Sequence, residues 1–406
     1  MTHTAEPTEA AEPTDASDPG RRAVLGGLAA AAALTAVQWT PLSRIPVGSA
    51  EATVPPPPVP PPGIAIYQQS YRNWSGELRV DGLWTCAPAD VVTLANWARA
   101  QGWTLRAKGH SHNWSPILVT ADAGSADTLL VDTTQNLTSI AVQTGATPSV
   151  TAPYNYPFSD FLPTEAADLL GQIIAGNSGL TPAFCNLQGA TSSAGLLATL
   201  SWDLWGWSKN TMLYIRPTTF RVTANGYAIL TKRADIQRVV SEFYAYYKGA
   251  LAAYQAQGRF PMNGPLEVRV TGLDDPAHTG VAGAVHPTLS ALRQRPDHPE
   301  WDVAVWLDIL TTPGTPYSQQ FYRETEQWVL ANYSGNYAQV RVEWSKGWGY
   351  SGTAAWSDPT AVGTTVPDSF RTGLPAGNNW DTAVAALDAY DPHRVFTNPF
   401  LDTLLT

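Results

Sequence analysis

In residues 212–344, the spacing of apolar residues predicts strands and helices in an order that few folds have. Apolar residues that alternate with polar ones predict β-strands, and apolar residues that recur every three to four positions predict helices. The predicted strands are 212–215, paired or continued by 221–230, then 266–271, 303–310 and 340–344, and the predicted helices are 236–254 and 321–329. This order of strand, helix, two strands, helix and strand is that of a ferredoxin-like sandwich. Both helices of such a sandwich cover one face of an antiparallel sheet, which leaves the other face free for a site.

The same alternation predicts which side chains lie on the free face. Leu266, Val268 and Val270 are expected to pack beneath the helices, so that their polar neighbours point the opposite way. The residues expected on the free face are Glu267, Arg269, Thr271, Ala304, Trp306, Asp308, Arg341 and Glu343. The alternative is an ordinary solvated face whose ion pairs are each worth roughly 0.2–1 kcal/mol.

A second constraining feature is a glycine-containing loop that follows a basic strand. A helix is predicted between Pro88 and Gly102, and strands are predicted over 103–108 and 129–131. The loop continues the first of these strands and reads Gly109-His110-Ser111-His112-Asn113-Trp114-Ser115-Pro116. A loop at a strand end that offers two imidazoles can bind a phosphorylated cofactor and form a covalent bond to it. The alternative is a pair of loop histidines that bond to backbone or water.

Composition narrows the class of protein. The chain has 406 residues, enough for two domains, and its net charge of -10 argues against nucleic acid or an anionic membrane as the main partner. The two cysteines, Cys86 and Cys185, have no metal-type spacing, and we expect no metal site. They are expected to be two free buried thiols, with one disulfide bridge as the alternative.

The N-terminal region has the pattern of an export signal. Arg21 and Arg22 precede an apolar stretch over 23–37 that is too short for a convincing membrane span, and small residues follow at 48–50. We therefore expect residues 1–50 to be a twin-arginine signal and the protein to be secreted, without integral membrane association. An uncleaved hydrophobic anchor is the alternative. Residues 51–63 form a proline-rich linker, and the globule is expected to begin near Gly63.

Several of these segments resemble known families. Residues 84–132 resemble the flavin domain of the vanillyl-alcohol oxidase superfamily, whose covalent members place a histidine three residues after such a glycine. That position is His112. The segments 264–272, 343–348 and 391–399 resemble the covalent-flavin (type II) cholesterol oxidases. The resemblance implies an α+β fold with two lobes. A truncated PCMH-type FAD-binding domain would span 64–149, and a ferredoxin-like, sterol-binding substrate domain with a C-terminal flavin-contacting segment would span 150–406.

The resemblance also implies roles for individual residues. Glu267, Arg269, Glu343 and Lys346 match active-site positions, whereas Asp308 stands where the family leads us to expect asparagine. The residues expected to hold FAD are Gly109, His110, Ser111, His112 and Asn398, with the covalent bond at His112 in the full-length family pattern. This chain, which lacks part of that pattern, is expected to carry little or no covalent FAD and to show weak oxidase activity.

The implied reaction is the oxidation of a 3β-hydroxysteroid by dioxygen through FAD, with release of peroxide and movement of a ring double bond. Glu267 or Glu343 would accept the hydroxyl proton, provided that burial raises its pKa. Arg269 would hold the developing alkoxide or ketone oxygen, and Lys346 would tune the carboxylates. The expected partners are a sterol and dioxygen, with transient contact to sterol-bearing membranes.

One departure from the family pattern concerns the FAD domain. Residues 141–147 begin the segment expected on the pyrophosphate side of the flavin, yet residues 150–154 already resemble the substrate domain. We infer an internal loss near 148–150 that removes much of the FAD domain. Two alternatives to a working oxidase follow. One is a truncated sterol-binding protein without flavin chemistry, and the other is a carbohydrate or alditol oxidase of the same superfamily. The aromatic residues over 154–207 favour a sterol over a sugar.

Overall fold

The computed structural model describes residues 56–109, 111, 113–124, 127–136, 149–152, 164–199, 204–207 and 221–405. The described residues fall into two compact units. The smaller unit contains 149–152, 164–167, 186–199 and 204–207, and the larger unit contains the others. The signal segment, His110, His112, the strand predicted at 212–215 and the segments 141–148 and 153–163 lie outside the described residues.

The smaller unit contains a short two-stranded sheet. Strand β5 (Ser149–Ala152) pairs antiparallel with β6 (Leu204–Trp207). Helices α4 (Thr164–Ile174) and α5 (Thr181–Thr199) each contribute residues to both units.

The main sheet of the larger unit has the topology predicted for residues 212–344. Its strands lie in the order β10-β7-β9-β8, and every neighbouring pair is antiparallel. The strands and helices are β7 (Thr223–Thr231), α7 (Ile236–Gln255), β8 (Leu266–Gly272), β9 (Val303–Thr311), α8 (Ser318–Asn332) and β10 (Gln339–Val342). The predicted order of elements is therefore confirmed, with the first described strand at 223–231.

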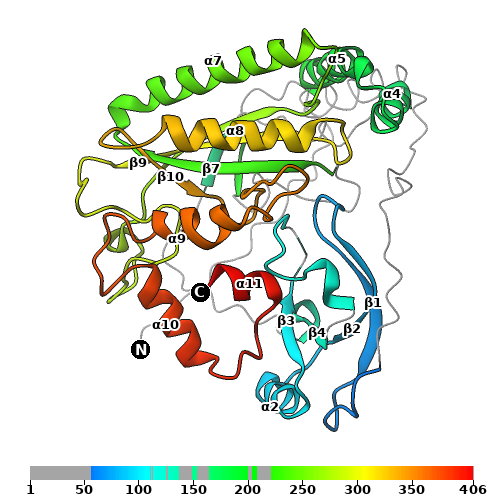
Figure 1. The fold of residues 1–406 in the computed structure, drawn as a ribbon, viewed down its shortest axis with the longest axis vertical. Coiled ribbons are helices and arrows are strands. Elements are labelled where there is room, and N and C mark those ends of the chain that lie inside the picture. Colours follow the sequence, from blue (N-terminus) through cyan, green and yellow to red (C-terminus); the bar gives the residue numbers. More distant parts are fainter. Residues whose placement is uncertain are drawn as a thin grey trace, which may run out of the picture. The chain divides into compact units, whose positions relative to one another are not determined.

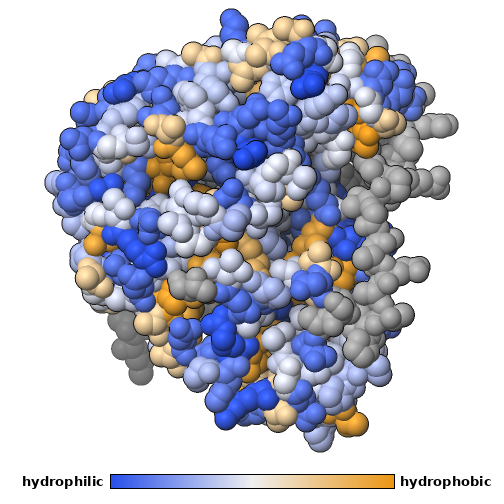
Figure 2. All heavy atoms as spheres, viewed as in Figure 1, coloured by the Kyte–Doolittle hydropathy of each residue, from blue (hydrophilic) through white to orange (hydrophobic). Residues whose placement is uncertain are grey.

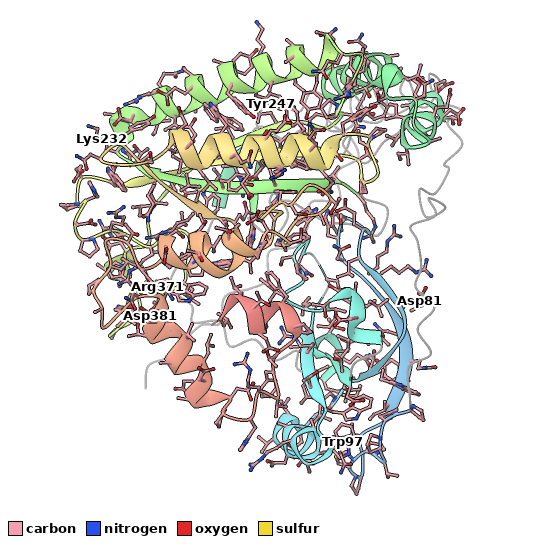
Figure 3. All side chains as sticks on the ribbon, in the orientation of Figure 1. Asp81, Trp97, Lys232, Tyr247, Arg371 and Asp381 are labelled. Atoms are coloured by element: carbon pink, nitrogen blue, oxygen red, sulfur yellow. The ribbon has the colours of Figure 1, made fainter. Side chains whose placement is uncertain are left out.

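Helices α7 and α8 run side by side across one face of this sheet (Figure 1). Aromatic side chains hold them together, because Phe321 of α8 makes edge-on contacts with Tyr247 and Tyr254 of α7. Figure 3 shows Tyr247 in the layer between the two helices. The sheet residues buried in this core include Tyr227, Ile229, Val305, Leu307, Ile309, Val340 and Val342. The alternation predicted for β9 and β10 is therefore confirmed.

Strand β8 departs from the prediction. Val268 and Val270 were expected beneath the helices, but they are 37% and 47% exposed, and only Leu266 packs against the core. The cause is the position of β8 at the edge of the sheet. Alternation therefore predicted the side to which these residues point, but the expectation that helices cover them was wrong.

A second four-stranded sheet precedes the main sheet in the sequence. Its strands β1 (Ile66–Arg72), β2 (Arg79–Cys86), β3 (Thr104–Lys108) and β4 (Thr128–Asp132) lie in the order β1-β2-β4-β3. Helix α2 (Val91–Gln101) begins after the Asp90 cap and ends at Gly102, which adopts a left-handed φ of 73°. The helix and the two strands predicted here are confirmed. Helix α3 (Thr133–Asn136) follows β4 directly.

Strand β3 differs from the half-buried strand that alternation predicts. In the sequence, Trp103, Leu105 and Ala107 alternate with Thr104, Arg106 and Lys108, which predicts that Arg106 lies on the polar side. Arg106 is instead 8% exposed and donates to the carbonyl oxygens of Leu118, Ile117 and Phe396. Burial lowers the pKa of Arg106 to about 10. The C-terminal segment covers this side of β3, since Leu105 also donates its N–H to the Val395 carbonyl at 2.6 Å.

Three short helices complete the larger unit: α9 (Val366–Ser369), α10 (Trp380–Tyr390) and α11 (Pro399–Leu404). No helix in the described part of the chain is long and apolar enough to span a membrane. Most of the surface in Figure 2 is hydrophilic, with small and separate hydrophobic areas. Both cysteines are free, as expected from the sequence, but the expectation that both are buried was wrong, because Cys185 is exposed.

Candidate active site

The face of the main sheet opposite α7 and α8 carries a row of residues set by strand register. Asp308 of β9 lies opposite Glu267 of β8 on one side and opposite Gly226 of β7 on the other. A Cβ atom at Gly226 would come within 2.7 Å of the Lys346 Cγ and within 2.9 Å of the Asp308 Oδ1. Glycine is required at this position because the space above it is already filled by Lys346 and Asp308.

Arg269 is the centre of the charged cluster. Its Nη2 lies 2.6 Å from the Oδ2 of Asp308 and 2.8 Å from the Oε2 of Glu343, and its Nε lies 3.0 Å from the Oε1 of Glu267. Its Cζ also lies 5.4 Å from the ring centre of Trp306. One guanidinium therefore joins three carboxylates from β8, β9 and the end of β10.

Lys346 reaches the same cluster from a turn that ends β10. The sequence predicted a strand through Trp344, but β10 ends at Val342 because the Lys346 N–H bonds to the Glu343 carbonyl at 3.0 Å. The Gly347 N–H then bonds to the Ala224 carbonyl at 2.7 Å, which returns the chain to β7. This turn places the Lys346 Nζ 3.8 Å from the Oδ2 of Asp308.

Trp114, from the loop after β3, contacts the cluster through Lys346. The Lys346 Nζ lies 4.3 Å from its ring centre, which is the distance of a cation–π contact. The Trp114 N–H bonds to the Ser345 carbonyl at 2.9 Å, and its indole nitrogen donates to the Val222 carbonyl at 2.6 Å. The loop after β3 is therefore joined by direct hydrogen bonds to the turn after β10 and to the residue that precedes β7.

Asp308 differs electrostatically from the other two carboxylates because its side chain is fully buried, whereas that of Glu343 is 17% exposed and that of Glu267 is 43% exposed. Burial raises the pKa of Asp308 to about 7, even though Lys346 and Arg269 both lower it. Its Oδ1 has no hydrogen-bond partner. The cluster can therefore gain or lose one proton near neutral pH.

The predicted flavin-side residues are placed only in part. Gly109 has open space where a Cβ would stand, and Ser111 adopts a left-handed φ of 58°. The Asn398 side chain bonds to the protein backbone. Its Nδ2 donates to the Pro116 and Ile117 carbonyls at 3.0 and 3.2 Å, and its Oδ1 accepts the Leu401 N–H at 2.9 Å. Its amide therefore caps α11 and holds the loop after β3.

The structure brings together all five residues proposed for catalysis, which are Glu267, Arg269, Asp308, Glu343 and Lys346. Sequence reasoning missed the contribution of Gly226. A signal for it exists, because Ala224, Gly226 and Ala228 place small residues at alternate positions of β7, on the side that faces the cluster.

A cavity of about 480 Å³ lies elsewhere in the larger unit. Its walls include Trp344, Trp380, Leu387, Phe396 and Leu401, and none of the five clustered residues lines it. This cavity is therefore separate from the charged face that carries the five candidate residues. No group of acidic, histidine and cysteine side chains suited to a metal ion occurs in the part of the chain that the structure describes.

One family model and several solved structures are similar to this chain. The family described as "Cholesterol oxidase, substrate-binding" matches residues 133–406. The solved structure of a "Solvent-stable cholesterol oxidase" is similar to this chain with a TM-score of 0.82 and 37% identity, over 87% of this chain and 100% of that one. The crystal structure of cholesterol oxidase from B. sterolicum is similar with a TM-score of 0.82 and 30% identity, over the same shares of the two chains.

No curated protein matches the sequence. The matched region contains the ferredoxin-like sheet and its charged face. The chain belongs to the cholesterol oxidase substrate-binding family.

Proposed function

We propose that this protein is an FAD-dependent oxidase of 3β-hydroxysteroids of the type II, covalent-flavin class. The observation that carries the proposal is the convergence of Arg269 on three carboxylates, with Lys346 at the same Asp308 oxygen, on the uncovered face of the sheet. Such a set can both accept a proton from a hydroxyl and stabilise the oxygen that remains.

The loop after β3 fits a bound flavin. Gly109 leaves room for close approach of a ligand to the backbone, and the left-handed Ser111 turns the chain sharply between the two histidine positions. FAD held there, with a covalent bond proposed at His112, would accept the hydride from the carbinol carbon and return the electrons to dioxygen. Asn398 would support this loop indirectly, through its bonds to the Pro116 and Ile117 carbonyls.

The chain's own residues supply the acid–base chemistry. We assign the removal of the hydroxyl proton to Glu343 or Glu267, the two carboxylates of the cluster that solvent reaches. Arg269 touches both and would hold the developing oxyanion by charge and hydrogen bonding. Asp308, with its pKa of about 7, would store or release the proton that balances the cluster. The same groups could move the ring double bond, because that step also needs a proton removed and returned.

Two alternatives keep the fold and change the chemistry. The internal loss inferred near 148–150 would leave a sterol-binding protein with weak or no flavin chemistry, which we expect if much of the FAD surface is missing. A carbohydrate or alditol oxidase would use the same charged face. We favour a sterol because the substrate-binding family and the similar solved structures are both named for cholesterol oxidase.

The experiment that separates these functions is the absorption spectrum of the purified protein together with peroxide release from cholesterol and from an alditol. Flavin bands with cholesterol-dependent peroxide support the oxidase. Sterol binding without flavin bands supports the truncated binding protein, and alditol turnover contradicts the sterol assignment. Flavin that stays on the denatured wild type but not on His112→Ala locates the covalent bond, whereas flavin retained by both would move it to His110.

We also propose secretion through twin-arginine export, which rests on Arg21 and Arg22 before the apolar stretch 23–37. Replacing both arginines with lysine should leave the protein inside the producing cell. A lysine variant that is exported as well as the wild type would contradict this proposal.

A further inference from the structure

The face that carries the candidate active site continues along β10 to Arg341, whose guanidinium is almost completely buried. Arg341 is 1% exposed, and its Nη1 donates to the Arg293 and Ser290 carbonyls at 2.6 and 3.3 Å. Its Nε and Nη2 have no hydrogen-bond partner. Buried N–H groups without an acceptor are rare in folded proteins, so an acceptor is expected beside them.

A second buried guanidinium belongs to Arg293, whose backbone carbonyl accepts from Arg341 and whose positive charge acts on that residue. Arg293 is 3% exposed, and its Nη1 donates to the His286 carbonyl at 3.0 Å and to the Asn378 Oδ1 at 3.4 Å. Its Nε also has no partner. Burial, together with repulsion from Arg295 and Arg293, lowers the pKa of Arg341 to about 9.

The charges around these two arginines do not balance. Arg295 is neutralised by Asp297, at 2.6 Å. Asp274 is the carboxylate that attracts both Arg293 and Arg341, but it forms no ion pair with either, and its Oδ2 has no partner. Two buried guanidiniums beside one carboxylate leave one positive charge in excess among the described residues. An uncompensated buried charge is strongly unfavourable.

We propose that Arg341 and Arg293 bind a small monovalent anion of the size of chloride, between β10 and the segment 273–301. A single negative charge cancels the excess, and the low exposure of both side chains excludes bulky anions. The anion accepts the N–H groups of Arg341 Nε, Arg341 Nη2 and Arg293 Nε. It thereby ties the segment to the sheet, and it does so whether or not the protein binds flavin.

Thermal unfolding of the full chain in sodium chloride and in sodium gluconate, at equal ionic strength, tests the site. Gluconate is too large to enter, so chloride should raise the wild-type Tm by at least about 2 °C at concentrations well above its Kd. Arg341→Met, which keeps a long side chain beside Phe370, should lose this difference. Arg371→Gln is the matched control, because Arg371 is a partly exposed arginine paired with Asp368 and Asp381. It should retain the wild-type difference.

A second variant should change the chloride dependence of the Tm in the opposite direction to Arg341→Met. Asp274→Asn removes the one nearby negative charge, so its Tm should depend on chloride more strongly than that of the wild type. This test also applies if Arg341→Met does not fold. Equal Tm values for the wild type in the two salts would overturn the proposal, as would an Asp274→Asn protein with no greater chloride dependence.

Crystals grown in bromide give a direct readout. An anomalous peak within hydrogen-bond distance of the Arg341 Nη2 and the Arg293 Nε would support the anion. Density without anomalous signal would mean that only an ordered water accepts these N–H groups, and the proposal would then be wrong.

Discussion

The two faces of the β10-β7-β9-β8 sheet are built from the same strands and have opposite chemistry. On the helix-covered face, Tyr227, Ile229, Val305, Leu307 and Ile309 are buried among aromatic side chains of α7 and α8. On the other face, the row Gly226, Asp308 and Glu267 leads to Arg269 and the turn after β10. Because side chains alternate along each strand, successive residues point either into the core, where they stabilise the fold, or to the charged face, where the candidate catalytic residues lie. The comparison teaches that a substitution on one face should affect mainly one of these two properties.

The largest expected effect is on stability and concerns the helix-covered face. Phe321→Ala should lower the free energy of unfolding by about 3–5 kcal/mol, because the ring is 1% exposed and its removal leaves a cavity against Tyr247 and Tyr254. Chemical denaturation measures this loss. The turnover of the molecules that remain folded should change little. A folded Phe321→Ala protein with strongly reduced turnover would break the separation between the faces.

The next effect is on the reaction and concerns the charged face. Arg269→Ala should raise the barrier of sterol turnover by about 2.7–4 kcal/mol, the typical value of a positioned group at a developing oxyanion. Its cost in stability should stay below about 1 kcal/mol, since the Arg269 side chain is 42% exposed and solvent screens its ion pairs. Steady-state kinetics and denaturation measure the two quantities.

Arg371→Gln is the control for Arg269→Ala, because Arg371 is an arginine that forms ion pairs with Asp368 and Asp381 and with no residue of the charged cluster. Figure 3 shows Arg371 beside Asp381. This variant should match the wild type in turnover. A wild-type rate in Arg269→Ala would make Arg269 a structural member of the ion-pair network. Because Glu343 and Lys346 share partners with Arg269, double substitutions among the three should not be additive.

The next effect is on the pH dependence of stability, and it concerns Asp308 on the charged face. The pKa of Asp308 is about 7 in the folded protein and near 3.9 in an unfolded chain, so the folded state alone keeps the proton between these values. The stability due to this group is fully present below about pH 4 and is lost as pH rises to about 7, by at most about 1.4 kcal/mol per unit. Asp308→Asn should flatten the pH dependence of unfolding in this window.

Asp81 provides the control for the pH prediction. A hydrogen bond from Ser70, followed by one from Arg79, lowers the pKa of Asp81, so this group contributes stability that is lost as pH falls. Asp81→Asn should therefore leave the slope between pH 4 and 7 unchanged. An Asp308→Asn protein with the wild-type slope would show that burial does not control the charge of Asp308.

The apolar patterns were enough to predict the order of strands and helices in the main sheet domain and the side to which Glu267, Arg269 and Asp308 point, because a strand has a period of two residues. They could not predict that β8 is the edge strand, so the exposure of Val268 and Val270 was missed. These features depend on contacts between distant parts of the chain, which no local pattern contains.

The same limit applies to the site. Asn398 bonds to the Pro116 carbonyl, and Arg106 bonds to that of Phe396, over long separations in sequence. The pKa of Asp308 depends on its burial and on the charges of the neighbouring Lys346 and Glu343. Local periodicity therefore placed Glu267, Arg269, Asp308 and Glu343 on one face, and Lys346 was added by the family resemblance. The charge states of these residues and their supporting contacts required the folded structure.

The smallest expected effect is the change in the free energy of unfolding when N-terminal residues, which belong to neither face of the sheet, are deleted. Residues 1–50 have no periodic apolar pattern that would add to either core, so deleting them should change the free energy of unfolding by less than about 0.5 kcal/mol. A deletion through residue 62 should cost about 0.5–1.5 kcal/mol more, because it removes the Val59 carbonyl that accepts the Trp97 indole N–H at 2.9 Å. Denaturation of the two deletion proteins against the full chain measures the difference. Loss of cooperative unfolding in the shorter deletion would show that the N-terminal segment packs against the fold, and the two faces of the sheet would then not account for its stability.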